Sequence, residues 1–125
     1  MLPKEDLQQR WQQLQSSLIK QKGKEYTLDD LLILIGKQEA GWPPQKELTE
    51  KDKTDLLQLG ICCILVPVKY YKLIWVDDFG WPHYQQMQPL PCNNQEERTT
   101  LLKEYILLYN ERNKLVIESL PPVKK

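Results

Sequence analysis

The chain has 125 residues, the size of one domain, and is long enough to bury a hydrophobic core. Its 17 basic and 17 acidic residues cancel, so we expect no broad electrostatic surface for nucleic acid or an anionic membrane. The longest apolar run, residues 59–68, is shorter than the roughly 20 residues that cross a bilayer. The amino terminus lacks the apolar region of a secretory signal. We therefore expect a single domain over residues 1–125, cytoplasmic, with no membrane partner and with nucleic acid disfavoured.

The cysteine and histidine content limits metal and redox chemistry. Cys62 and Cys63 are adjacent in an apolar stretch, where cysteine usually acts as a small hydrophobic residue. Together with Cys92 and the single histidine, His83, they lack the paired spacing of a zinc site. We expect buried thiols, no disulfide framework, no metal and no cofactor.

A first helix is predicted over residues 4–22. Pro3 suits an early helical position, Glu5 and Asp6 oppose the positive end of the helix dipole, and Gly23 follows where a C-terminal cap is favoured. The apolar residues form a narrow stripe that requires a partner helix, in this chain or in a second copy. That stripe consists of Leu7, Trp11, Leu14 and Leu18.

Two Thr-x-x-Asp sequences, at 27–30 and 49–52, have the spacing of capping boxes. They predict helices over residues 28–40 and 50–66. The second half of the latter is so apolar that a strand over 61–66 is the alternative, because short apolar runs do not distinguish the two.

Residues 70–87 have the composition of a β-hairpin. The turn is expected at residues 77–80, where Asp can bond its own backbone and Gly80 can adopt a positive φ. Pro82 places the return strand at an edge. The alternation predicts a core-facing side made of Tyr71, Leu73 and Trp75.

A last helix is predicted over residues 95–116, capped by Asn93 or Asn94 and bearing two adjacent apolar rows. The proline-rich segment 117–125 is expected to be a frayed tail. The fold class that follows is α+β, mostly α, with four helices and one hairpin packed on them.

One acid and imidazole group stands close together in the sequence: Asp77, Asp78 and His83. Across a hairpin turn these side chains could bind a metal or act as a general base. Acidic residues at turns, however, commonly serve backbone hydrogen bonds. No nucleophile motif or phosphate-binding loop occurs, so we assign no catalytic residue and expect no enzyme.

Aromatic residues are concentrated in the hairpin, and Trp and Tyr are the residues most enriched in interface hot spots. Gly-Trp-Pro also occurs twice, at 41–43 and 80–82, so two loops that met in space would display two tryptophans together. The candidate binding residues are Trp42, Asp77, Asp78, Trp81, His83 and Tyr84.

These patterns favour a non-enzymatic protein–protein interaction module that uses the hairpin. A homodimer through the first stripe (Leu7, Trp11, Leu14, Leu18) and the 101–116 helix is one expected assembly, although the two could also satisfy each other. One alternative is a small ligand-binding or hydrolytic domain around Asp77, Asp78 and His83. A second is a nucleic-acid accessory protein that uses Lys20, Lys22, Lys24 or the Lys124–Lys125 tail.

Overall fold

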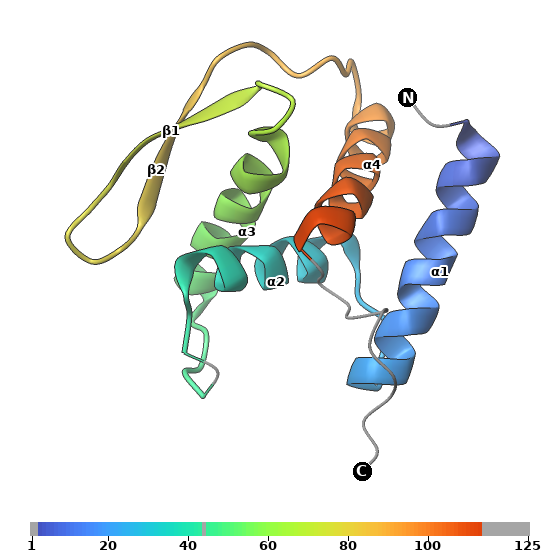
Figure 1. Ribbon diagram of the computed structural model, residues 1–125, viewed down its shortest axis with the longest axis horizontal. Coiled ribbons are helices and arrows are strands. Elements are labelled where there is room, and N and C mark those ends of the chain that lie inside the picture. Colours follow the sequence, from blue (N-terminus) through green and yellow to red (C-terminus); the bar gives the residue numbers. More distant parts are fainter. Residues whose placement is uncertain (1–2, 44, 114–125) are drawn as a thin grey trace.

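The computed structural model describes residues 3–43 and 45–113. Within them, four helices and one antiparallel hairpin form the α+β, mostly α fold that the sequence predicted (Figure 1). The end of the last predicted helix and the expected tail at 117–125 lie outside the described residues. The elements are α1 (Lys4–Lys22), α2 (Leu28–Ala40), α3 (Glu50–Leu65), β1 (Tyr71–Val76), β2 (Pro82–Gln86) and α4 (Gln95–Asn113).

Both capping boxes form as predicted. The Thr27 hydroxyl accepts from the backbone N–H of Asp30 at 3.0 Å, and the Asp30 carboxylate accepts in return from the N–H of Thr27. Thr49 and Asp52 repeat this arrangement at the start of α3. The helix α3 then runs to Leu65, so the helical interpretation of this apolar segment is confirmed and the strand alternative is wrong.

The α2 and α3 helices cross in close backbone contact at two glycines. A Cβ atom on Gly36 would lie 2.2 Å from the carbonyl oxygen of Leu56, and one on Gly60 would lie 2.1 Å from that of Leu32. No side chain fits at such distances, so only glycine allows the two backbones to approach this closely. The crossing is reciprocal and buried, and we call it the glycine crossing.

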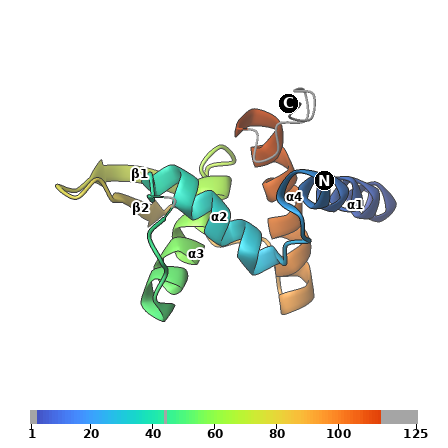
Figure 2. The same cartoon turned by 90° about the horizontal axis from the view of Figure 1, so that it is seen from below.

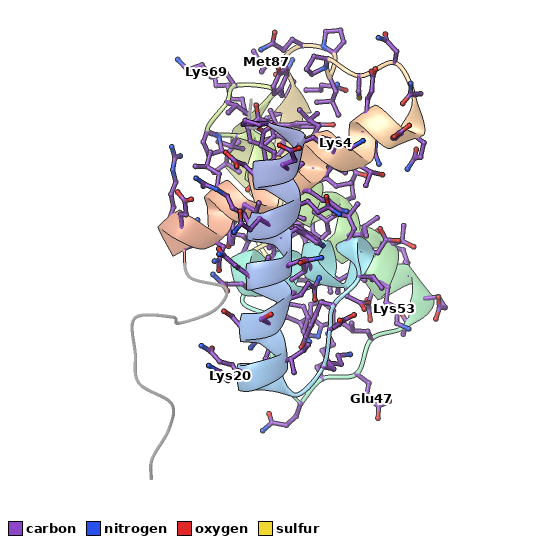
Figure 3. The ribbon with its side chains drawn as sticks, turned by 90° about the vertical axis from the view of Figure 1, so that its right-hand side faces the viewer. Lys4, Lys20, Glu47, Lys53, Lys69 and Met87 are labelled. Carbon is purple, nitrogen blue, oxygen red and sulfur yellow. The ribbon has the colours of Figure 1, made fainter. Side chains whose placement is uncertain are left out.

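The α4 helix lies between this crossed pair and α1 (Figures 1 and 2). In Figure 3, α1 passes in front of α4 at a steep angle. The apolar stripe of α1 is buried there, with Leu14 2 % and Leu18 0 % exposed. The apolar stripe of α1 and the apolar rows of α4 thus pack against each other within one chain. A dimer through them remains a prediction.

A polar contact joins α4 to the end of α2. The hydroxyl of Tyr109 donates to the Glu39 carboxylate at 2.6 Å and accepts from the side-chain amide of Gln38 at 3.2 Å. Burial, and then the neighbouring carboxylate, raise the pKa of Tyr109 above its ordinary value. The phenol therefore stays protonated and remains a donor.

The hairpin packs on α3 at its root and then projects away from the helices (Figures 1 and 2). Its register shifts between Leu73, which lies opposite Tyr84, and Trp75, which lies opposite His83. Neighbouring residues of β2 point to opposite faces, so this bulge at Ile74 moves Trp75 away from the face of Leu73. The predicted core face of Tyr71, Leu73 and Trp75 is therefore wrong at Trp75, which is 54 % exposed. It is also wrong at Leu73, which is 45 % exposed, and of the three only Tyr71 packs against the core.

Candidate functional site

The hairpin turn is organised around the carboxylate of Asp77. Its Oδ1 accepts hydrogen bonds from the backbone N–H groups of Phe79 and Trp81, both at 2.9 Å. The Asp77 carbonyl accepts from the N–H of Gly80, which has a φ of 85°. The predicted turn, with its left-handed glycine, is confirmed. Asp77 fixes the backbone of the projecting end.

The second carboxylate oxygen of Asp77 reaches β2. Its Oδ2 lies 2.9 Å from Nε2 of His83, and because an ionised carboxylate can only accept, Nε2 carries the proton. The contact with His83, followed by the backbone donors, lowers the pKa of Asp77 below its ordinary value. The His83 ring also stacks on Trp75, with centroids 4.6 Å apart and planes 9° from parallel. Trp75, Asp77 and His83 thus form one connected unit, which we call the turn clamp.

Beyond the turn clamp the hairpin exposes apolar side chains. Phe79, at the turn, is 96 % exposed. More than half of Ile74, Trp75 and Val76 is also exposed. Single exposed apolar residues are ordinary, but a contiguous group on one projecting element is typical of an interaction site.

The root of the hairpin is anchored on α3. The Tyr84 hydroxyl lies 3.4 Å from Sγ of Cys63, and Tyr71 and Tyr84 pack against the hydrophobic core. Burial raises the pKa of the Cys63 thiol to about 12, so this cysteine stays protonated near neutral pH and is a poor nucleophile. These contacts attach the base of the hairpin to α3.

An open groove of about 500 Å³ separates α3 from the hairpin. Asp55 and Cys62 line it from α3, and Trp81 and His83 line it from the hairpin side. Asp55 already pairs with Lys51 at 2.7 Å, and burial raises the pKa of Cys62. The groove could accept a small ligand, but it offers no activated nucleophile among its described residues.

The predicted site residues fall into two groups. The structure brings Asp77, Trp81, His83 and Tyr84 together in the hairpin, with Asp78 exposed beside them. Trp42 has separate surroundings in the α2–α3 connection, where its Nε1 donates to the Lys46 carbonyl and its ring lies under the Lys46 amine.

Sequence reasoning did not name Phe79, Ile74 or Val76 as binding residues, although the predicted alternation already put Ile74 and Val76 on the face away from the core. The bulge at Ile74, which turns Trp75 away from the face of Leu73, depends on the pairing with β2 and is visible only in the fold.

The nucleic-acid alternative relied on lysines near the end of α1 and on the tail. Lys20 and Lys22 end α1, and the Lys24 amine lies 5.0 Å from the centroid of the Tyr26 ring. The Lys124–Lys125 tail lies outside the described residues. Over residues 3–43 and 45–113, no group of three metal-ligating side chains gathers, and no helix is long and apolar enough to cross a bilayer.

Comparisons with protein-family models, with curated proteins and with solved structures gave no significant match.

Proposed function

We propose that this protein is a non-enzymatic, cytoplasmic protein–protein interaction module whose binding element is the hairpin end. The observation that carries the proposal is the exposure of Phe79 and of the β1 residues Ile74, Trp75 and Val76 on an element that projects from the helices. The three free cysteines, Cys62, Cys63 and Cys92, suit a reducing compartment.

The order of the turn supports recognition rather than nonspecific adhesion. Asp77 holds two backbone N–H groups and the His83 ring, and the ring holds Trp75. A surface fixed in this way loses little conformational entropy when it binds, which favours affinity. Trp75 is held by this stacking and belongs to a residue type that is enriched in interface hot spots.

A second candidate is a ligand-binding site in the groove between α3 and the hairpin. The hydrogen bond between Asp77 and His83, beside a groove that His83 lines, favours it. Two observations weaken it: Oδ1 of Asp77 is occupied by backbone donors, and Trp75 stacks on the His83 ring. Asp77 and His83 are therefore already engaged in the structure of the turn and are less available to a ligand.

The test of the interaction module is affinity capture from the native cell with the full chain and with Phe79→Ser. Phe79 makes almost no contact within the chain, so its replacement leaves the fold intact while it removes apolar contact area. We expect capture of one specific partner to fall at least tenfold, as loss of a hot spot does.

The matched control is Ile19→Ser, which removes a 46 % exposed apolar side chain from α1 instead of the hairpin. Capture that falls equally with both variants, or with neither, would remove the hairpin as the binding element. A loss of capture with Asp55→Ala, at a residue that lines the groove from α3 and lies outside the turn clamp, but not with Phe79→Ser would favour the groove.

A further inference from the structure

The β1 strand has an unpaired edge that differs from that of β2. The sheet in the described residues has two strands, so each has one edge without a strand partner. On β2, Pro82 has no N–H to donate, which discourages pairing at that edge. On β1 every residue after Tyr71 is exposed and none is proline. An incoming strand would therefore add to β1.

The charges at the ends of β1 identify which strand fits. Lys69 and Lys72 stand at its start, and Asp77 and Asp78 follow its end. Lys69, Lys72 and Asp78 are exposed and make no ion pair within residues 3–43 and 45–113. Two copies of β1 laid antiparallel would put the basic start of each against the acidic end of the other, whereas parallel copies would oppose like charges.

The hairpin also exposes apolar side chains along and beside this edge. Leu73, Ile74, Trp75, Val76 and Phe79 together expose on the order of 500 Å². A specific interface buries roughly 800 Å² on each partner. Edge pairing covers the backbone of β1 and only the parts of these side chains that lie along the edge, so we expect a smaller and weaker interface. The bulge at Ile74 interrupts the edge near its middle, so we expect a dissociation constant of about 10 µM rather than nanomolar affinity.

We propose that the protein forms a homodimer by antiparallel pairing of β1 with β1 of a second copy, which makes a four-stranded sheet across a two-fold axis. Such an interface is self-complementary, because each residue meets its counterpart through the same operation. The proposal rests on the proposed function in that it names a second copy of the chain as a partner of the hairpin.

The test is sedimentation velocity of the full chain from about 1 to 300 µM. We expect the wild type to pass from monomer to dimer over this range. The basic-end variant (Lys69→Glu with Lys72→Glu) and the acid-end variant (Asp78→Lys) should each weaken dimerisation at least tenfold, because each places like charges together twice. An equimolar mixture of the two should recover dimers, because opposite charges then meet.

The charge-matched control is Lys20→Glu with Lys22→Glu, which alters α1 by the same amount and should leave the dissociation constant unchanged. Three results would overturn the proposal: a wild type that stays monomeric, a dimer that neither hairpin variant weakens, or variants that fail to recover on mixing. A dimer insensitive to the hairpin charges would point to the helices instead. A monomeric wild type whose capture of another protein still depends on Phe79 would refute this inference and leave the proposed function standing.

Discussion

The glycine crossing and the hairpin contain similarly apolar sequences, but the first is buried and the second is largely exposed. The α2 run from Leu31 to Ile35 is largely buried, and the β1 run from Leu73 to Val76 is exposed. Gly36 and Gly60 let two helices approach each other without a gap, whereas β1 after Tyr71 is exposed and the hairpin meets the core through Tyr71, Trp81 and Tyr84. Apolar content alone therefore does not place a segment in the core. The geometry of the surrounding backbone determines whether the segment is buried.

The strongest test of this contrast is Gly36→Ala. The new Cβ would collide with the backbone at Leu56, which cannot move as a side chain can, so we expect unfolding to become easier by about 3 kcal/mol. Urea denaturation measures the change. The control is Gly23→Ala, which meets no atom within 4 Å and should cost only the left-handed backbone strain of about 1 kcal/mol. Equal effects would show that the close approach contributes nothing.

A smaller and more local effect is expected from Asp77→Ala. The change removes the acceptor of two backbone N–H groups and of the His83 ring. Amide hydrogen exchange at Phe79 and Trp81 should become about tenfold faster, while amides of the glycine crossing keep their protection. Asp78→Ala is the matched control, because that neighbour is exposed. Faster exchange throughout the chain would contradict the independence of the two regions.

Acid should weaken the hairpin through the same carboxylate. The contact with His83, followed by the backbone donors, lowers the pKa of Asp77 in the folded state. Its contribution to stability is therefore complete above the unfolded pKa of about 4 and is lost as the pH falls through the lower folded value. The difference in stability between wild type and Asp77→Ala should shrink as the pH falls below about 4. A difference that grew on acidification would reverse the assigned sign.

The smallest expected effect on stability is that of Phe79→Ser. A side chain that is 96 % exposed contributes almost nothing to the core, so the free energy of unfolding should change by less than about 0.5 kcal/mol. Urea denaturation at low protein concentration measures it without the influence of association. A loss of several kcal/mol would mean that the turn packs against the body.

The local features were predictable from the sequence because their causes are local. Thr27 and Asp30 specify a helix start within four residues, and Gly80 specifies a turn within four. The bulge at Ile74 and the glycine crossing depend on partners distant in the chain. For that reason the orientation of Trp75 was predicted wrongly, and the role of Gly36 was not predicted at all.

The candidate site divides in the same way. The proximity of Asp77 and His83 follows from a short hairpin, and the sequence anticipated it. The separate surroundings of Trp42 and Trp81 do not follow from the repeated Gly-Trp-Pro, because the repeat specifies turn chemistry and not the position of the turn in space.

Pro82 also limits how many strands can add to the sheet. It lies opposite Val76, one position from the hydrogen bond between the Asp77 N–H and the Trp81 carbonyl, so its nitrogen points outward, where no hydrogen is available to donate. A strand can therefore attach to one side of the hairpin but not readily to the other. In the proposed dimer a further strand would have to add at the Pro82 edge, so we expect assembly to stop at two copies rather than extend into fibrils.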